Sequence, residues 1–365
     1  MKVAIATDAW TPQTNGVVTT LLATVDMLRA WGHQVRVISP QGLRSIPCPS
    51  YPEIRLAVAP GRSVSRVLAD FRPHAIHIAT EGPVGLAMRR HCLRHSIPFT
   101  TSYHTRYPEY LRARWPIPRA VSYAWLRRFH GAATRTFVSS QTLQQQLGAR
   151  GFGPLHLWQR GVNLQRFHPG AGIERPAPLA GLPRPIMAYV GRLAVEKNLD
   201  AFLRLDIPGT KVIVGDGPQR ETLTARFPRA VFTGYRFGAE LVRMLASADV
   251  FVFPSLTDTF GLAMIEAGAC GVPVAAFPVP GPVDVIEQGV TGFLHEDLAV
   301  AIRHALPLDR RVCARRCAAF TWEAATEQFH AGLEPLPAGV RSALFVRRGS
   351  AMIAHRQPSG AGDAP

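Results

Sequence analysis

Two successive blocks of short apolar runs alternating with helical segments constrain the fold of this 365-residue chain most strongly. In the first block, branched and apolar residues predict strands at Val3–Ala6, Val35–Ser39, His74–Ala79, Phe99–Tyr103, Thr136–Ser139 and Leu155–Trp158. In the second block, strands are predicted at Ile186–Val190, Lys211–Val214, Val231–Thr233, Val250–Phe253 and Val272–Phe277. The clearest helix is Val17–Trp31, which ends at Gly32. Such alternation predicts parallel sheets.

A stretch rich in proline and glycine, HPGAGIERPAPLAGLPRP, separates the two blocks and predicts a linker. We therefore expect an α/β fold with two Rossmann-like, doubly wound domains that face a cleft. The expected segments are a first domain at 1–167, the linker at 168–185, a second domain at 186–320, a helix at 321–334 and a flexible tail at 335–365.

The charge of the chain is strongly uneven. Residues 1–170 hold 21 lysines and arginines against 6 acids, whereas residues 171–365 hold 20 against 19. A basic half of this kind attracts an anionic membrane surface, a nucleic acid or an acidic substrate. A GC-rich genome would explain why only three of the basic residues are lysines, but not why acids are scarce before residue 170.

Several features favour a cytoplasmic protein. The five cysteines are odd in number and scattered, which is typical of free thiols. Asp8 interrupts the N-terminal apolar run too early for a signal peptide. The most membrane-like stretch, Phe260–Val283, contains Glu266 and several prolines, and is better explained as a buried core segment than as a spanning helix. Membrane contact is expected only as peripheral binding to the inner face of the cell membrane.

The first motif with a chemical meaning is GRLAVEKNL, directly after the predicted strand Ile186–Val190. Gly191 permits a tight turn. Arg192 and Lys197 then place two cations near the strand end, ahead of a helix. A departing nucleoside diphosphate needs such charge neutralisation. Taken alone, the pair also fits two solvated surface cations.

The second motif is PSLTDTFGLAMIEAGACGVPV, which follows the predicted strand Val250–Phe253. Residues 260–262 are expected to open a helix whose free N–H groups bind phosphate oxygens. Asp258 lies in the preceding loop and Glu266 lies about one turn inside the helix. A carboxylate at this place can accept hydrogen bonds from two vicinal hydroxyls. The alternative for Glu266 is a charge favoured only by the helix dipole.

Together the two motifs resemble the retaining GT-B glycosyltransferases of family 4, and the resemblance spans roughly residues 1–333. It implies that Arg192 and Lys197 bind the donor diphosphate. It also implies that Asp258 and Glu266 are the two acids of the family's E-x₇-E motif, with Glu266 on the ribose. Asp258 is one methylene shorter than glutamate, as in the branch of the family that has a TDTFG-like loop.

Shorter motifs match the family in order and spacing. In NGV, Gly16 matches the residue of the first βα loop that lies close to the diphosphate. In SYHTRYPEYL, His104 matches the histidine that approaches the transferred sugar, although a lone loop histidine is more often structural. RGVNLQRFHP, which begins at Arg160, resembles the stretch leading out of the first domain. GDGP with Gly217 and FTGY with Tyr235 match loops near the phosphates and the base.

The resemblance thus implies an acceptor-binding first domain and a donor-binding second domain. The implied catalytic residues are His104, Arg192, Lys197, Asp258 and Glu266. The implied donor-binding residues are Gly16, Gly191, Arg192, Lys197, Gly217, Tyr235, Phe260, Gly261, Leu262 and Glu266. The expected reaction is retaining transfer of a hexosyl group to a lipid or glycan, with GDP-mannose as the expected donor. The main alternative is a UDP-sugar-dependent glycolipid glycosyltransferase.

Other functional classes lack their motifs. The chain has no Asp-x-Asp pair, so neither a metal nor another cofactor is expected beside the nucleotide-sugar co-substrate. It has no GxGxxG and no GxxxxGK[ST] motif, which dinucleotide and P-loop sites would need. The alternatives of another class are an epimerase on the same scaffold or a non-catalytic nucleotide-sugar-binding protein. The presence of both cations and both acids argues against a non-catalytic protein.

The stretch Arg106–Arg135 is the candidate acceptor or membrane surface. It holds seven arginines and one acid, with aromatic residues interleaved. Val121, Trp125 and Phe129 recur at helical spacing, so they form one apolar stripe. Such a helix fits a lipid headgroup layer, or the stripe packs into the core and the arginines are solvated. The candidate residues are Arg112, Trp115, Trp125, Arg127 and Arg128. No nucleic-acid-binding module is recognised, so no nucleic-acid partner is expected.

Overall fold

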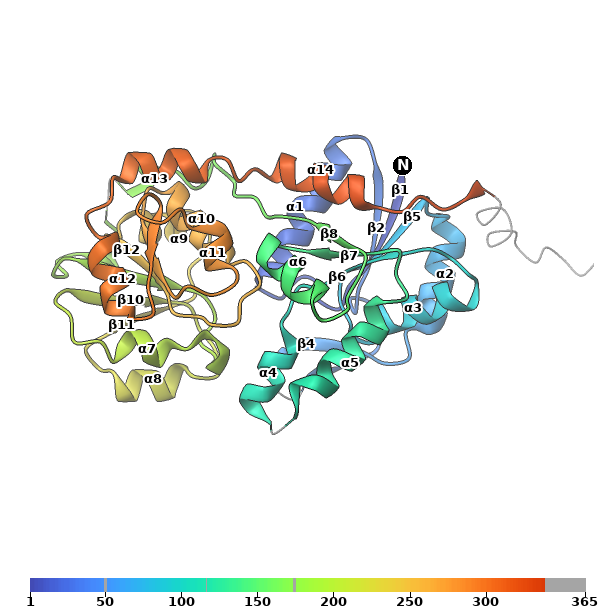
Figure 1. Ribbon diagram of the computed structural model, residues 1–365, viewed down its shortest axis with the longest axis horizontal. Helices are drawn as coiled ribbons and strands as arrows, with labels where there is room; N and C mark the ends of the chain where they lie inside the picture. Colours follow the sequence, from blue (N-terminus) through green and yellow to red (C-terminus); the bar gives the residue numbers. More distant parts are fainter. Residues whose placement is uncertain (49–50, 116, 173–174, 339–365) are drawn as a thin grey trace, which may run out of the picture.

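The computed structural model describes residues 1–48, 51–115, 117–172 and 175–338. These residues form two lobes, each built around a six-stranded sheet (Figure 1). The strand pairs within both large sheets are parallel. The predicted α/β class with two doubly wound domains is therefore confirmed.

The N-terminal sheet has the strand order β2-β1-β5-β6-β7-β8. Its strands are β1 (Lys2–Ala6), β2 (Gln34–Ile38), β5 (Ala75–Ile78), β6 (Thr100–Ser102), β7 (Arg135–Val138) and β8 (Leu155–Leu157). The helices between them are α1 (Gly16–Ala30), α2 (Gly61–Phe71), α3 (Pro83–Arg94), α4 (Tyr107–Arg114), α5 (Arg119–His130) and α6 (Gln141–Gly148). A small antiparallel sheet of β3 (Ser45–Cys48) and β4 (Tyr51–Ala57) follows β2. Sequence analysis missed this pair, since its prolines argue against a strand.

The C-terminal sheet has the strand order β11-β10-β9-β12-β13-β14. Its strands are β9 (Ile186–Val190), β10 (Thr210–Val214), β11 (Val231–Gly234), β12 (Val250–Phe253), β13 (Val274–Ala276) and β14 (Gly292–Leu294). Its helices are α7 (Leu199–Leu203), α8 (Arg220–Arg226), α9 (Gly238–Ala246), α10 (Leu262–Ala269), α11 (Pro282–Val285), α12 (Leu298–Ala305) and α13 (Arg310–Cys317). The order reverses between β9 and β12, where ligands bind in such sheets. The corresponding point of the N-terminal sheet lies between β1 and β5.

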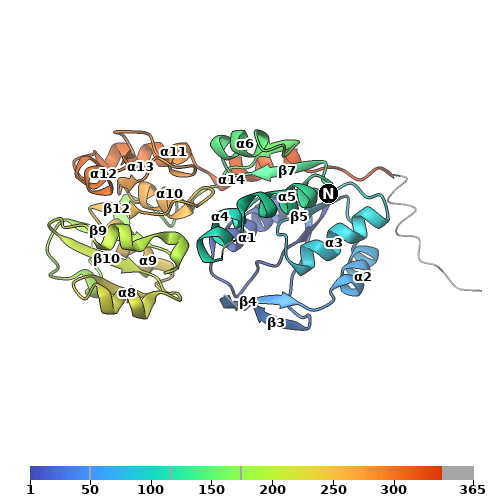
Figure 2. The same ribbon diagram turned by 60° about the horizontal axis from the view of Figure 1, so that its bottom comes forward.

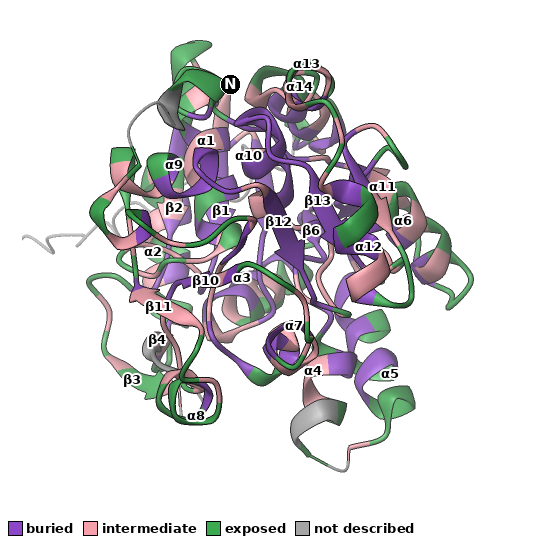
Figure 3. Ribbon diagram, turned by 90° about the vertical axis from the view of Figure 1, so that its left-hand side faces the viewer, coloured by how far each residue is buried: buried purple, intermediate pink, exposed green. Residues whose placement is uncertain are grey.

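The inner strands β1, β5, β9 and β12 of the two large sheets are buried along most of their length, and Figure 3 draws buried strands such as β12 in purple. In β12, Phe251 and Phe253 pack into one apolar cluster, whereas Val250 and Val252 pack into another. The side chains of a strand alternate between the two faces, so helices must cover both sides of the sheet. This burial fixes the strand ends, and the loops that follow them carry the functional motifs.

The last described helix returns from the C-terminal lobe to the N-terminal lobe (Figure 2). This helix, α14 (Trp322–Gly332), lies within the range 321–334 predicted for the last helix. Its Phe329 is fully buried, with its ring 4.7 Å from that of Trp158. Leu336 is also buried, and its N–H donates to the His74 carbonyl oxygen at 2.7 Å. The start of the predicted tail at 335 is therefore packed on the N-terminal lobe, and residues 339–365 lie outside the described residues.

The remaining expectations concern the linker, the cysteines and membrane spans. The predicted linker contains the short turns η1 (Pro169–Gly172) and η2 (Ala177–Leu179). All five cysteines are free, and four of them are buried. Over the described part of the chain, no helix combines the length and the apolar character needed to cross a membrane. The exact domain boundaries stay predictions.

Candidate active site

The two chemical motifs meet where the C-terminal sheet reverses its order. Gly191 follows β9 with a φ of 153°, and a Cβ there would lie 2.6 Å from the Tyr189 hydroxyl oxygen. The chain therefore needs glycine at this exit turn. Gly261 has a φ of 93° and begins α10 after the loop that follows β12. This conformation also favours glycine, and the N–H groups in the first turn of α10 point back toward the loop, as at any helix N-terminus.

Lys197 and Asp258 form the centre of the site. Lys197 Nζ lies 2.6 Å from Asp258 Oδ1, and the side chains are only 17% and 16% exposed. Burial by itself would lower the pKa of Lys197, but the charge of Asp258 raises it overall. Lys197 is therefore a cation at neutral pH. The second carboxylate oxygen, Asp258 Oδ2, is buried without a hydrogen-bond partner among the described residues, so it is left for a ligand.

Arg192 and Tyr110 complete this charged cluster. Arg192 lies close enough to Lys197 for its charge to oppose the protonation of the amine. Tyr110 reaches the cluster from α4 of the other lobe and lies near Asp258 and Arg192. Burial raises the pKa of Tyr110, so its phenol stays protonated. Sequence analysis counted Tyr110 only among the aromatic residues of the basic stretch and missed this position.

His104 approaches the site from the loop after β6. Arg160 Nη2 donates to His104 Nδ1 at 3.2 Å, and the Arg160 guanidinium stacks on the Trp158 ring at 4.5 Å. Burial lowers the pKa of His104 well below its usual range, and the charge of Arg160 adds to this shift. His104 is therefore neutral. Since Nδ1 accepts, the proton of the neutral ring lies on Nε2.

The Nε2 atom of His104 is buried and has no hydrogen-bond partner among the residues described. A buried donor without a partner is costly, which favours a ligand atom at this place. The RGV motif indicated only a stretch leading out of the first domain. A role for Arg160 was not predictable from it, since a contact across 56 residues leaves no local sequence signal.

Hydrogen bonds join the loops of the two lobes beside the site. Thr259 Oγ1 donates to the His104 carbonyl oxygen at 2.9 Å, and Ser139 Oγ donates to the Thr259 carbonyl oxygen at 2.7 Å. Gly16 in the first βα loop lies against α10, because a Cβ there would be 3.5 Å from Leu262 Cδ1. His104 and Gly16 of the N-terminal lobe thus meet the Asp258 loop and α10 of the C-terminal lobe, as the predicted site requires.

Glu266 lies about one turn inside α10 and is half-buried. Burial raises its pKa to about 7, and the nearby positive charge of Arg166 partly opposes that shift. The dipole of a helix N-terminus would lower the pKa of a carboxyl, so burial dominates the surroundings of this side chain. The ribose role of Glu266 stays a prediction.

The other predicted donor residues fall into different environments. Gly217 packs against the Leu193 backbone, beside Arg192, because a Cβ there would lie 2.5 Å from the Leu193 carbonyl oxygen. Tyr235 is 42% exposed and stacks on Phe237 with ring centroids 5.8 Å apart, which offers an exposed flat surface. The Phe260 side chain is buried in the core. Its expected contribution is the backbone N–H at the helix start, which this burial of the side chain leaves unchanged as a prediction.

The candidate acceptor or membrane residues lie apart from this cluster, on α4, α5 and the connection between them. Arg112, Trp115, Arg127 and Arg128 are exposed. The apolar stripe is split, because Val121 and Trp125 are 61% and 47% exposed whereas Phe129 is 3% exposed and lies in the core. Of the three residues of the stripe, only Phe129 is therefore buried in the core. The first two remain an exposed apolar edge flanked by arginines.

Comparison with known families accounts for most of the chain. Residues 14–166 match the profile described as Glycosyltransferase Family 4, and residues 184–306 match that described as Glycosyl transferases group 1. A GDP-mannose-dependent alpha-mannosyltransferase of Mycobacterium tuberculosis is 34% identical over 318 residues, covering 80% of this chain and 83% of that protein. Its namesake in Corynebacterium glutamicum is 32% identical over 366 residues, covering 90% and 87%.

Comparison with solved structures confirms the fold. Sucrose-phosphate synthase from Thermosynechococcus elongatus superposes with a TM-score of 0.72 at 22% identity, covering 90% of this chain and 97% of that one. Anabaena HepE, in complex with UDP and glucose, superposes with a TM-score of 0.64 at 17% identity, covering 91% and 98%. Both chains share the two-lobe architecture described above.

Proposed function

Because this chain belongs to the family 4 glycosyltransferases, we propose that it transfers a mannosyl group from GDP-mannose to a lipid or glycan, with retention of anomeric configuration. The choice of donor is supported by relatives that are GDP-mannose-dependent and match over most of their length. The single observation that carries the proposal is the free oxygen of Asp258. This atom is buried and, among the residues that the structure describes, has no hydrogen-bond partner; its position beside a paired lysine suits a sugar hydroxyl next to a diphosphate.

The roles of the site residues follow from their charges and positions. In the proposed reaction, the bond between the mannosyl C1 and the diphosphate oxygen breaks, and a bond from the acceptor oxygen to C1 forms. The acceptor proton passes to the departing phosphate. Lys197, Arg192 and the free N–H groups of α10 stabilise the negative charge that develops on the diphosphate. The same residues hold the diphosphate before the bond breaks.

Two further groups orient the sugar and the nucleoside. Asp258 Oδ2 accepts a hydrogen bond from a sugar hydroxyl, and His104 donates one from Nε2. Glu266 in its ionised form accepts from the two ribose hydroxyls. The hydrogen bonds between Thr259, His104 and Ser139 bring the lobes together over the donor and reduce the access of water, which would otherwise hydrolyse it.

The exposed edge of α4 and α5 is the proposed acceptor side. Trp125 and Val121 present apolar surface, and Arg112, Arg127 and Arg128 lie beside them. Such a combination suits an anionic lipid surface, where aromatic rings sit at the headgroup level and arginines bind phosphates. We therefore propose peripheral binding to the cytoplasmic face of a membrane.

A nucleotide panel tests the donor. The melting temperature would be measured with GDP, UDP and ADP, with and without EDTA, on the wild type and on Glu266→Ala. A ligand at 100 times its Kd adds about 2.7 kcal/mol of stability. We expect stabilisation by GDP that EDTA leaves unchanged and that Glu266→Ala removes. Stabilisation by UDP instead would keep the enzyme class and overturn the donor.

A further inference from the structure

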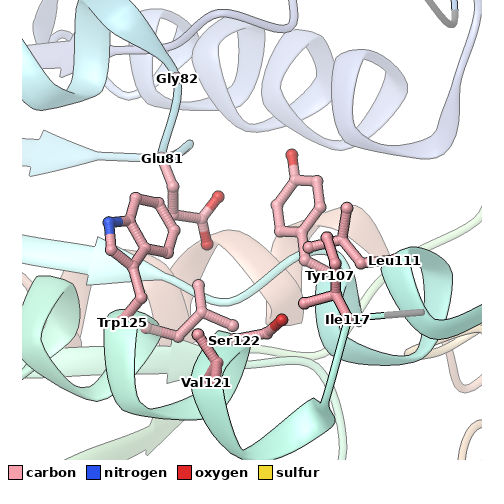
Figure 4. Close-up of a pocket in the computed structure, with 9 residues that line it drawn as sticks. Glu81, Gly82, Tyr107, Leu111, Ile117, Val121, Ser122 and Trp125 are labelled. Carbon is pink, nitrogen blue, oxygen red and sulfur yellow. The ribbon is translucent and has the colours of Figure 1, made fainter. Parts of the chain in front are cut away.

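A cavity of about 490 Å³ opens between α4 and α5 of the N-terminal lobe (Figure 4). Its volume lies within the range of sites that bind small molecules. The residues that line it are Glu81, Gly82, Tyr107, Leu111, Ile117, Val121, Ser122, Trp125 and Leu126. None of these residues belongs to the proposed donor site, whereas Val121 and Trp125 also lie on the proposed acceptor side.

Most of the cavity wall is apolar. Leu111 comes from α4, Ile117 from the connection, and Val121 and Leu126 from α5. Leu126 is fully buried, whereas Val121 remains 61% exposed at the rim. An apolar surface of this kind, open to water on one side, gains free energy when a hydrocarbon chain covers it.

One end of the cavity is polar. The Glu81 side chain is only 4% exposed, and Glu81 Oε1 lies 3.1 Å from His130 Nε2. Thr101 holds the other ring nitrogen of this histidine at 2.9 Å. Figure 4 shows the Glu81 carboxylate between the rings of Trp125 and Tyr107, at the side of the cavity nearest Gly82. A buried carboxylate fixed in this way accepts a hydrogen bond from a ligand hydroxyl.

The polar end faces the reaction cleft. Glu81 and Gly82 follow β5, at the point where the N-terminal sheet reverses its order. Gly82 lies against Asp8, because a Cβ there would be 2.4 Å from Asp8 Cγ. Asp8 begins the loop that leads to Gly16 and so to α10. A ligand whose polar end binds at Glu81 therefore points that end toward the donor.

Helix α4 borders both the cavity and the donor cluster. Tyr107 and Leu111 line the cavity, whereas Tyr110 of the same helix lies near Asp258. Tyr107 and Tyr110 are three residues apart and therefore neighbours on the helix surface. The cavity and the donor cluster thus adjoin one another along α4.

We infer that this cavity binds the hydrocarbon chain of a hydroxyl-bearing amphiphile, with the hydroxyl end at Glu81 and the chain between α4 and α5. The inference rests on the proposed function in one respect, since it identifies the amphiphile as the acceptor. A free sugar fits less well, because a sugar needs many polar partners and the wall is mostly apolar. An acidic headgroup is also disfavoured at this end, because its negative charge would be repelled by the carboxylate of Glu81.

Quenching of tryptophan fluorescence by a brominated alcohol tests the cavity without any donor. The probe is 12-bromododecan-1-ol below its solubility limit, and 3-bromopropan-1-ol is the short-chain control. Each buried methylene strengthens binding by about fourfold, so we expect half-maximal quenching at a concentration at least roughly 100-fold lower for the long probe. Trp125→Phe should remove most of the saturable quenching, because Trp125 lines the cavity.

A matched pair of variants locates the binding. Val121→Glu places a charge in the wall, whereas Ala120→Glu adds the same charge to the neighbouring exposed residue outside it. We expect Val121→Glu to weaken saturable quenching at least tenfold and Ala120→Glu to change it less than twofold. Equal effects of the two variants, or equal binding of the long and short probes, would overturn the inference. Binding of the probe with no turnover of GDP-mannose would instead overturn only the proposed function.

Discussion

Arg160 Nη2 donates a hydrogen bond to His104 Nδ1 at 3.2 Å and so fixes the tautomer of a buried histidine. The proton of the neutral ring is left on Nε2, which has no partner within the described structure. The two residues are far apart in sequence, and the His104 backbone contacts Thr259 in the loop that carries Asp258. This pair defines what His104 can do, because a neutral imidazole with Nε2–H donates a hydrogen bond and cannot act as a base through that atom.

The tautomer predicts different effects for two substitutions of His104. The amide nitrogen of Gln lies near the position of Nε2, whereas that of Asn lies near Nδ1. We expect His104→Asn to lower kcat/KM about 5- to 150-fold, the effect of leaving a buried polar partner unsatisfied, and His104→Gln to retain several-fold more activity. Equal activity of the two variants in a steady-state assay would contradict the proposed role of His104 Nε2 as a hydrogen-bond donor.

Removal of the Lys197 charge should affect the rate more than binding. Lys197 pairs with Asp258 at 2.6 Å and stays protonated at neutral pH. Because its charge is needed most when the diphosphate departs, Lys197→Ala should lower kcat by roughly 10²–10³. Lys211→Ala is the matched control, since the Lys211 amine donates to the Leu203 and Leu205 carbonyl oxygens of the α7 segment. A near-normal kcat for Lys197→Ala would exclude the role.

Binding of GDP should depend on pH through Glu266. Burial raises the pKa of Glu266 to about 7, so its carboxylate is the minor form below that pH. Since the ionised form accepts the ribose hydroxyls, the Kd of GDP should fall as pH rises from 6 to 8. Isothermal titration calorimetry would measure it, with Glu266→Gln as the variant that should lose this dependence. A wild-type Kd that is constant between pH 6 and 8 would contradict the role of Glu266.

The same pKa predicts how the stability of the ligand-free protein changes. The folded protein holds the Glu266 proton more tightly than the unfolded chain, whose value is near 4.5. The contribution of Glu266 to the free energy of unfolding is therefore largest at low pH and declines as pH rises from about 4.5 to 7. Urea unfolding of the wild type and Glu266→Gln at pH 5 and pH 8 should show the variant gaining relative stability at pH 8.

Membrane binding should require the arginines of α5. Arg127→Ala with Arg128→Ala removes two exposed charges beside Trp125. At about 1 kcal/mol per basic residue near an anionic surface, the pair should weaken binding to phosphatidylglycerol vesicles roughly 30-fold. Co-sedimentation would measure this. Arg315→Ala with Arg316→Ala on α13 is the matched adjacent pair and should have little effect. An equal loss of vesicle binding in both double variants would mean that general positive charge, and not the α5 surface, drives the binding.

The sequence was sufficient for the sheets because burial imposes a strong pattern. Strands such as Ile186–Val190 and Val250–Phe253 have the predicted bounds, since both faces are covered and every residue is apolar or aromatic. The β3–β4 pair and β14 were missed. The β3–β4 pair contains prolines, which interrupt the strand pattern, and β14 has only three residues. Neither segment therefore shows a periodicity long enough to be detected.

The site was partly predictable for a related reason. Arg192, Lys197, Asp258 and Glu266 lie within two short segments, so motif spacing identified them. Tyr110 and Thr259 act across the lobes, and Arg160 contacts His104 within the N-terminal lobe, so all three contacts depend on how distant loops meet. Which residues of the α5 stripe are buried could also be learned only from the structure. Spacing places Val121, Trp125 and Phe129 on one face, but the end of the core decides that only Phe129 is covered.

The most direct test of the proposed reaction is to follow GDP-mannose by ¹H NMR with the purified protein in EDTA. Water then serves as the acceptor, and UDP-glucose is the comparison donor. The account predicts slow release of mannose that first appears as the α anomer, with kcat/KM for GDP-mannose at least tenfold above that for UDP-glucose. The appearance of the β anomer first, or consumption of UDP-glucose alone, would contradict retaining mannosyl transfer from GDP-mannose.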